Sequence, residues 1–349
     1  MENKYHPCSL QIFKNASFIG FKNKRIILDE HHKFMNNTIL ERDWKLGQDM
    51  KTQLMTKINN NTNISHYKNV FLFTESYGDR NICHWFTEQL MVLNYLVDLL
   101  KRDNNNDSNI NTTNSNINTT DNTFKIIINK NRRSSMNTII KDYLLLVPNL
   151  DETNILELDL QDFIQLRCNT LYLGNAIKCD LKNIYPLWNS LHLNLKINNE
   201  LNNETFNIKY SKKIYMSRRN IYQPDKQTNT RILKNINEIS NIIVSKGYQE
   251  VFTDEIKNIQ ERIYLFQNLD EIICELGAGM HNLLYCKEGI KLTVLYQNNN
   301  ISWLQEYYPL FINKKFKVQI ITGNTLNNNH NGNWLNTPWY LQPESLTNI

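Results

Sequence analysis

The sequence lacks the marks of a disulfide-stapled, zinc-binding or membrane-spanning protein. Its 6 cysteines occur singly and never as a Cys-x-x-Cys pair, which argues against a zinc cluster or a disulfide framework and favours reduced thiols. No apolar run approaches the roughly 20 residues that a membrane-spanning helix needs, and the polar first residues carry neither a secretory signal nor an anchor. We therefore expect a soluble cytoplasmic protein, located in the host-cell cytoplasm if the source is viral.

The composition is that of a globular protein with one strong bias. Hydrophobic residues make up 41% of the chain and charged residues 21%, and 349 residues leave room for two domains of roughly 100–200 residues each. Asparagine is in excess, with 56 residues, which is typical of AT-rich coding and points to no function.

The first domain is predicted to span residues 1–205 and to alternate strands with helices. We expect strands at Val70–Thr74, Lys125–Asn129, Ile155–Leu158 and Thr170–Ala176, and helices at His84–Lys101 and Ser134–Leu146. Residues 103–123 are almost wholly Asn, Ser, Thr and Asp, so they bury too little apolar surface to offset the entropy of ordering. They are predicted to form a disordered insertion inside this domain.

The second domain is predicted to span residues 206–349, after a polar patch at Asn198–Glu204. Its expected strands are Lys213–Met216, Gln249–Phe252, Glu271–Cys274, Lys291–Leu295 and Lys317–Ile321, and its expected helices are Arg231–Lys246, Asn258–Asn268, Gly279–Cys286 and Ser302–Tyr308. This alternation implies a doubly wound parallel sheet that binds ligands at the carboxyl ends of its strands. We expect two such α/β domains to face each other across a cleft, with the tail Trp334–Leu346 as a candidate to return to the first.

Positive charge is concentrated near the start of the second domain. Residues 212–234 contain seven Lys or Arg residues and a single acid, Asp225. Arg218 and Arg219 follow the carboxyl end of a predicted strand, where a guanidinium can bind a pyrophosphate in a bidentate manner. The alternative is a solvated basic loop.

A second candidate anion site follows the predicted strand Glu271–Cys274. In the run Gly277-Ala278-Gly279-Met280-His281-Asn282, small residues let backbone N–H groups and the positive end of a helix approach a phosphate. The alternative is tight packing of helix on strand. NAD is disfavoured, because Asn282 stands where a dinucleotide fold has a third glycine, and Leu295-Tyr296-Gln297 contains no acidic residue.

His84 and Glu88 are the candidate catalytic residues of the first domain. They lie four positions apart, so both can face the cleft from one side of a helix, and either one could act as a base. A histidine near a helix start is more often a packing or capping residue, and that alternative stays open.

Taken together, these segments resemble glycosyltransferase family 61. The resemblance is carried by Asn81–Glu88, Ile214–Arg219, Arg231–Asn235 with Glu238, Gly247-Tyr248 and Gly277–Tyr285. The family includes bacterial capsular-polysaccharide enzymes, plant xylan xylosyl- and arabinosyltransferases, and eukaryotic protein O-linked N-acetylglucosaminyltransferases. The resemblance implies a GT-B fold of two Rossmann-like domains, a nucleotide-sugar donor, usually a UDP-sugar, held by the second domain, and inversion at the anomeric carbon without an essential metal.

The candidate donor-binding residues lie in the second domain and are Arg218, Arg219, Arg231, Asn235, Gly277, Ala278, Gly279, His281 and Asn282. Leu276 and His281 depart from the family, which commonly has His and Thr at these places. The chain contains no Asp-x-Asp pair, the element with which many sugar-nucleotide enzymes hold a divalent ion, and no His-x-x-x-His pair. We expect neither a metal nor another cofactor.

We therefore expect an inverting hexosyl- or pentosyltransferase that moves a sugar from a nucleotide donor to a hydroxyl group of a glycan or protein. Two other interpretations stay open. A basic nucleic-acid-binding protein is suggested by the isoelectric point of about 8.7, although the net charge of +5 is modest and no nucleic-acid-binding motif occurs. A non-catalytic protein that binds sugar nucleotides or glycans is the other.

Overall fold

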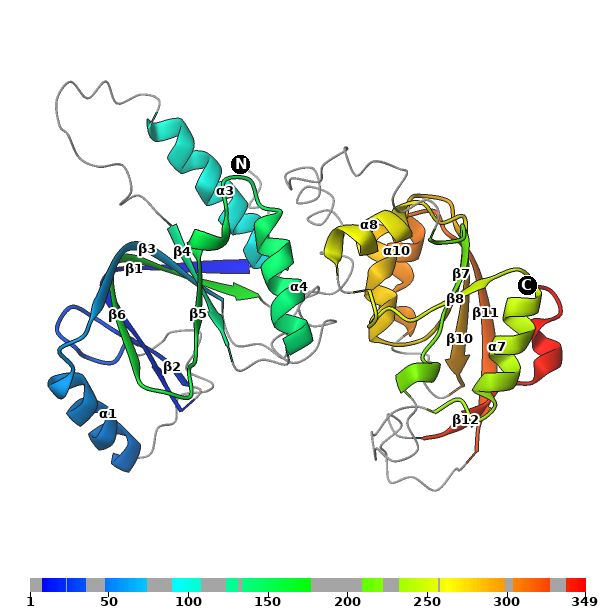
Figure 1. Cartoon of the computed structure of the whole chain (residues 1–349), viewed down its shortest axis with the longest axis horizontal. Coiled ribbons are helices and arrows are strands. Elements are labelled where there is room, and N and C mark those ends of the chain that lie inside the picture. The colour runs from blue at the N-terminus through cyan, green and yellow to red at the C-terminus, as the bar shows by residue number, and fades with distance from the viewer. Residues whose placement is uncertain are drawn as a thin grey trace. The chain divides into compact units, whose positions relative to one another are not determined.

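The computed structural model describes most of the chain as two compact units. The described residues are 8–22, 24–35, 48–73, 90–107, 124–130, 134–176, 209–221, 232–256, 258–298, 304–326 and 337–349. The first unit comprises Met1–Cys179 with Pro186–Lys196, and the second comprises Asp180–Tyr185 with Ile197–Ile349 (Figure 1). In the described part, no helix has the length and apolar character needed to cross a membrane.

The first unit is built on a six-stranded mixed sheet with the order β2-β1-β6-β3-β4-β5. Its strands are β1 (Cys8–Phe21), β2 (Lys24–Leu28), β3 (Ser65–Phe73), β4 (Phe124–Asn129), β5 (Ile155–Leu158) and β6 (Ile164–Ala176), and its helices are α1 (Gln48–Asn60), α3 (Leu90–Asp107), α4 (Ser134–Leu145) and the short η5 (Glu152–Asn154). β1 pairs antiparallel with both β2 and β6, whereas β6, β3, β4 and β5 pair in parallel.

Alternation along β1 gives the first sheet two apolar faces. Phe18 belongs to a buried cluster with Ile27 and Leu72, whereas the next residue, Ile19, belongs to a cluster with Leu54 of α1. Because successive side chains of a strand point to opposite faces, α1 covers one face of β1 and β2 while the main core fills the other.

The first unit differs from the sequence-based prediction in two ways. The sheet is mixed rather than doubly wound and parallel, because β1 and β2 add an antiparallel edge that we did not predict. The helix expected to end at Lys101 continues to Asp107, so the first five residues of the expected disordered insertion are helical. Residues 108–123, His84 and Glu88 lie outside the described residues.

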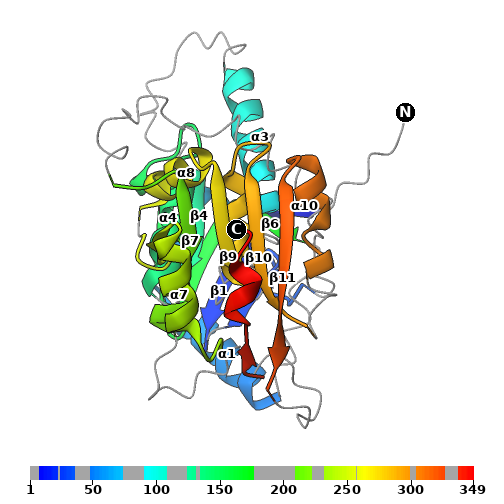
Figure 2. The same cartoon turned by 90° about the vertical axis from the view of Figure 1, so that its right-hand side faces the viewer.

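The second unit has the strand order β12-β11-β10-β9-β7-β8 (Figure 2). Its strands are β7 (Lys213–Met216), β8 (Gln249–Val251), β9 (Glu271–Glu275), β10 (Lys291–Gln297), β11 (Lys317–Thr325) and β12 (Trp339–Tyr340), and its helices are η6 (Arg219–Ile221), α7 (Ile236–Ser245), α8 (Ile259–Gln267), η7 (Ala278–Tyr285), α10 (Tyr308–Asn313) and η9 (Pro343–Leu346). β12 pairs antiparallel with β11, and all other pairs are parallel.

The five parallel strands form a doubly wound sheet, as predicted for this half of the chain. Numbered 1 to 5 along the chain from β7, the parallel strands lie in the spatial order 2-1-3-4-5. The chain therefore places β8 on one side of β7 and β9 on the other, and the switch point lies between β7 and β9. Helices α7 and η9 lie on one face of the sheet, and α8 and α10 lie on the other (Figure 1).

Three helices of the second unit differ from their predicted form, and the tail has a defined place. α7 begins at Ile236 rather than at Arg231, and η7 is a 3-10 helix. Within the predicted helix Ser302–Tyr308, Leu304 and Gln305 are helical, and after a turn α10 begins at Tyr308 and continues to Asn313. Of the tail that we considered as a return to the first domain, residues 337–349 form β12 and η9 of the second unit, where β12 pairs with β11 and η9 contacts α7.

Candidate functional site

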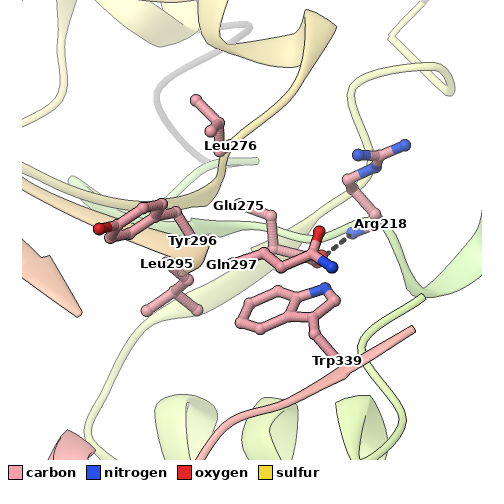
Figure 3. A pocket seen from close by; sticks show the side chains of 7 residues that line it. All are labelled: Arg218, Glu275, Leu276, Leu295, Tyr296, Gln297 and Trp339. Carbon is pink, nitrogen blue, oxygen red and sulfur yellow. Dashed lines mark hydrogen bonds between the residues drawn. The ribbon is translucent and has the colours of Figure 1, made fainter. Parts of the chain in front are cut away.

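A pocket lies at the switch point of the second sheet, at the carboxyl ends of three strands (Figure 3). It is lined by Arg218, Glu275, Leu276, Leu295, Tyr296, Gln297 and Trp339. The lining combines a cation, a carboxylate and an amide with apolar and aromatic side chains, a mixture that is typical of ligand pockets.

A buried carboxylate anchors the loop that carries Arg218. Glu275 ends β9 and is 3% exposed. Its Oε1 accepts hydrogen bonds from the backbone N–H of Arg218 and from the hydroxyl of Tyr215, each over 3.3 Å. The guanidinium of Arg218 extends away from Glu275 and Gln297 (Figure 3). The loop is thus held by its backbone, while the cationic group projects from the end of β7.

Arg219 has a different setting from its neighbour. Its Nη2 lies 2.5 Å from Oε2 of Glu250, and Oε1 of Glu250 accepts from the hydroxyl of Ser240 over 3.1 Å. This ion pair links the loop after β7 to β8 and α7. Arg231, another candidate donor-binding residue, lies outside the described residues.

The Gly277–Asn282 segment follows β9, as the sequence suggested, but two of its side chains point inward. His281 and Asn282 are both 3% exposed. Nδ1 of His281 lies 3.0 Å from both the carbonyl of Ala278 and the hydroxyl of Tyr307. Nδ2 of Asn282 donates to the carbonyl of Gly279 over 2.7 Å. These contacts hold the turns of η7 and leave its first backbone N–H groups as the part suited to an anion.

Gly279 allows η7 to pack closely on the end of β7. A Cβ atom at this position would lie 3.3 Å from Cε of Met216, which is tighter than most such contacts. Gly277 has an extended backbone with a φ of 175°, which any residue can adopt. For Gly279, tight packing of helix on strand therefore describes the structure well.

Asn235 contacts the C-terminal segment through its side-chain amide. Its Nδ2 donates to the carbonyl of Leu341 over 2.8 Å, and its Oδ1 accepts from the N–H of Leu341 over 3.3 Å. It is the N-cap residue of α7, yet its side chain makes no capping hydrogen bond. The amide instead fixes the segment that carries Trp339.

Sequence reasoning missed Glu275, Gln297 and Trp339 as pocket residues. Glu275 had a usable signal, since it is an acidic residue that directly follows the buried apolar run Ile272–Cys274. Trp339 had none, because nothing in its local sequence indicates that it reaches the switch point.

Neither a metal cluster nor a reactive thiol is found among the described residues. In this part of the chain, no group of three or more His, Cys, Asp or Glu side chains is placed to hold a metal ion. Burial raises the pKa of both Cys168 and Cys286 to about 12, and it also raises the pKa of Cys274. Because these thiols stay protonated at neutral pH, none of the three is suited to act as a nucleophile.

The fold and the pocket together define a class of protein. A doubly wound α/β sheet with a pocket at its switch point, beside an arginine and a helix start, is the arrangement with which many proteins bind nucleotides. The model of the family Glycosyltransferase 61 matches residues 82–294, more than half of the chain, and the chain belongs to this family. No curated protein matches the chain.

Family membership confirms the resemblance inferred from the sequence and makes the protein a glycosyltransferase by family. It implies a sugar donor and an acceptor. The matched residues include every candidate donor-binding and catalytic position named above, and they end within β10 before Gln297 and Trp339.

Proposed function

We propose that the protein is an inverting, metal-independent glycosyltransferase that uses a nucleotide sugar, preferably a UDP-sugar, and transfers the sugar to a hydroxyl group of a glycan or protein. The observation that carries the proposal is the position of Arg218 directly after β7, at the switch point and beside the pocket, in a chain of family 61. The two units would then form the two halves of a GT-B enzyme, with the donor on the second.

In this proposal the second unit stabilises the leaving group. The sugar leaves a nucleoside diphosphate, on which negative charge develops in the transition state. Arg218 can bind two phosphate oxygens with its guanidinium fork, and the first N–H groups of η7 offer further donors. Arg231 is a further candidate cation. These groups take the place that a divalent ion has in metal-dependent transferases.

The first unit would supply the base. Inverting transfer is a single displacement, in which the base removes the proton of the acceptor hydroxyl as its oxygen attacks the anomeric carbon. The bond between that carbon and the phosphate oxygen breaks, and the nucleoside diphosphate leaves with the electron pair. Glu88 or His84 is proposed for this role from the sequence, with Glu88 preferred.

The experiment measures hydrolysis of UDP- and GDP-sugars, which needs no known acceptor, and then compares variants with the best donor. Arg218→Ala is expected to lower kcat/KM roughly 30- to 1000-fold. Arg218→Lys should restore only part of this loss, because an ammonium group keeps the positive charge but cannot bind in a bidentate manner. Activity should survive EDTA.

A matched control is Lys287→Ala. Lys287 forms an exposed ion pair with Asp270 at the amino end of β9, so its removal takes one positive charge from the same unit away from the pocket. We expect wild-type kcat/KM for this variant. Wild-type kinetics in both Arg218 variants, or loss of activity in EDTA with recovery in Mn²⁺, would contradict the proposed handling of the leaving group.

A further inference from the structure

We propose that Trp339 contacts the donor, with its indole Nε1–H donating a hydrogen bond to an oxygen of the nucleoside diphosphate. This inference rests on the proposed function, because it names a contact within the same pocket. It extends the site to Trp339. This residue is carried by residues 337–341, called here the C-terminal wall, which lie beyond the residues matched by the family model.

The C-terminal wall is fixed through its backbone to β10 and to the segment before α7. Nε2 of Gln297 donates to the carbonyl of Thr337 over 3.0 Å. The carbonyl of Trp339 accepts from the N–H of Lys234 over 2.9 Å, and the N–H of Trp339 donates to the carbonyl of Ile232 over 3.0 Å. Since these bonds do not involve the indole, they set its position without occupying its N–H group.

Asn235 completes this attachment. Both polar atoms of its side-chain amide bond to the backbone of Leu341, two residues after Trp339. Asn235 is a candidate donor-binding residue from the sequence. Its contacts with Leu341 also let it act as a positioning residue, through the C-terminal wall.

Packing against β11 orients the indole. Gly323 of β11 has no side chain, and a Cβ atom there would lie only 2.4 Å from Cε3 and 2.7 Å from Cζ3 of Trp339. The benzene edge of the indole therefore fills the space above Gly323. The edge that carries Nε1 is the opposite edge, and in Figure 3 it lies on the side of Gln297 and Arg218.

The polar edge of the indole has chemistry that suits a phosphate or ribose oxygen. Within the described residues, Nε1–H of Trp339 makes no hydrogen bond, and this atom does not belong to the buried polar atoms that lack a partner. An indole N–H only donates. Its ligand must therefore offer an acceptor, and Arg218 in the same pocket selects an acceptor that bears negative charge.

The test compares nucleotide affinity in two neighbouring aromatic variants. UDP, or GDP if UDP does not bind, is titrated into the full chain by calorimetry. Trp339→Phe keeps an aromatic ring on Gly323 but removes the N–H, so we expect affinity to fall about tenfold. Tyr340→Phe is the matched control, because its side chain points to the other face of β12 and does not line the pocket. Its affinity should equal that of the wild type.

A second measurement uses the unmodified protein. In ¹⁵N-labelled wild type, at least one indole N–H resonance should shift on saturation with the nucleotide, and Asn235→Ala should reduce that shift by loosening the C-terminal wall. This measurement holds even if Trp339→Phe fails to fold.

The outcomes separate the two proposals. If the wild type binds UDP, Arg218→Ala abolishes binding, and Trp339→Phe binds as tightly as the wild type, then Trp339 does not contact the donor while the proposed function stands. Saturation with UDP without any indole shift would equally exclude this contact. If the wild type binds neither UDP nor GDP, the proposed function fails and the contact of Trp339 fails with it.

Discussion

The two sheets differ in how far apart in sequence their paired strands lie. In the second unit, β7 pairs with both β8 and β9, and all three strands lie within residues 213–275. In the first unit, β1 pairs with β6 along nearly its whole length, so Cys8 is opposite Ala176. The second sheet is assembled from local strand and helix units, whereas the first depends on a pairing between distant segments.

The two ends of the second sheet also differ from each other. At the amino ends of the strands, Glu271 of β9 lies 2.5 Å from Nζ of Lys213 and 3.6 Å from Nζ of Lys291, and it accepts from Tyr248 over 2.7 Å. The carboxylate at this end is thus paired within the protein. The carboxyl ends carry the pocket and Arg218, and this is the end where we place the donor.

The largest expected effect comes from one core substitution in each sheet. Leu72 of β3 and Ile273 of β9 are both fully buried, so Leu72→Ala and Ile273→Ala should each lower the free energy of unfolding by about 2–5 kcal/mol. Only Ile273→Ala should weaken UDP binding, because Ile273 lies two residues before Glu275, which lines the pocket. Denaturant unfolding and UDP titration check this, and a large loss of affinity in Leu72→Ala would contradict a donor site confined to the second unit.

A pair of glycine substitutions sharpens the comparison with a smaller effect. A Cβ on Gly174 of β6 would lie 2.3 Å from Cγ1 of Val92 in α3, and a Cβ on Gly323 would lie 2.4 Å from the indole of Trp339. Gly174→Ala and Gly323→Ala should each cost about 1–3 kcal/mol of stability through overpacking.

The two glycine variants should differ in their effect on the donor. Gly323→Ala displaces Trp339 and should weaken UDP binding, whereas Gly174→Ala should not, and each variant is the stability control for the other. Equal UDP affinities in the two variants would argue against a part for β11 and the C-terminal wall in the site.

The smallest effect concerns the charges at the amino ends of the second sheet. The hydrogen bond from Lys213, together with that from Tyr248, lowers the pKa of Glu271 below its ordinary value of 4.5, against the opposing effect of burial. A carboxyl group whose pKa is lowered by folding stabilises the folded protein at pH values above its ordinary pKa. This stabilisation is lost as the pH falls through the folded-state pKa.

Glu271→Gln should therefore cost about 1 kcal/mol of stability at neutral pH, and the cost should shrink as the pH falls below 4.5. Glu157→Gln in the first unit is the control. Glu157 pairs with Lys141, and because both side chains are about a third exposed, this ion pair contributes little to stability. Unfolding curves at several pH values check this, and a cost that stays constant down to about pH 2 would be inconsistent with the ion pairs.

The second sheet could largely be predicted because its signals are local. Short apolar runs bounded by polar turns predicted β7 with its observed bounds and β9 to within one residue, and Asn258 marked the start of α8 by capping it. The antiparallel edge of the first sheet could not be predicted, since no feature of Cys8–Phe21 identifies its partner more than a hundred residues away.

The candidate site was predictable to the same degree as the elements that carry it. The place of Arg218 after β7 follows from the strand alone, and so does the place of Gly277 after β9. Trp339 enters the pocket through pairing with β11 and through bonds to residues near α7, which only the folded chain brings together. The inward direction of His281 and Asn282 likewise depends on Tyr307 and Arg262, both distant in sequence.

The pairing of β1 with β6 has a consequence for synthesis on the ribosome. Gly20 and Ile164 are opposite each other in the sheet but are separated by about 140 residues of chain, which at roughly 5–20 residues per second takes on the order of ten seconds to translate. During this time β1 has emerged with β2 on one edge but without β6 on the other, and it carries Phe18 and Ile19, which are fully buried in the finished fold. The nascent chain therefore presents an apolar two-stranded segment with an unpaired edge before the first sheet can close, which is the kind of segment that chaperones bind.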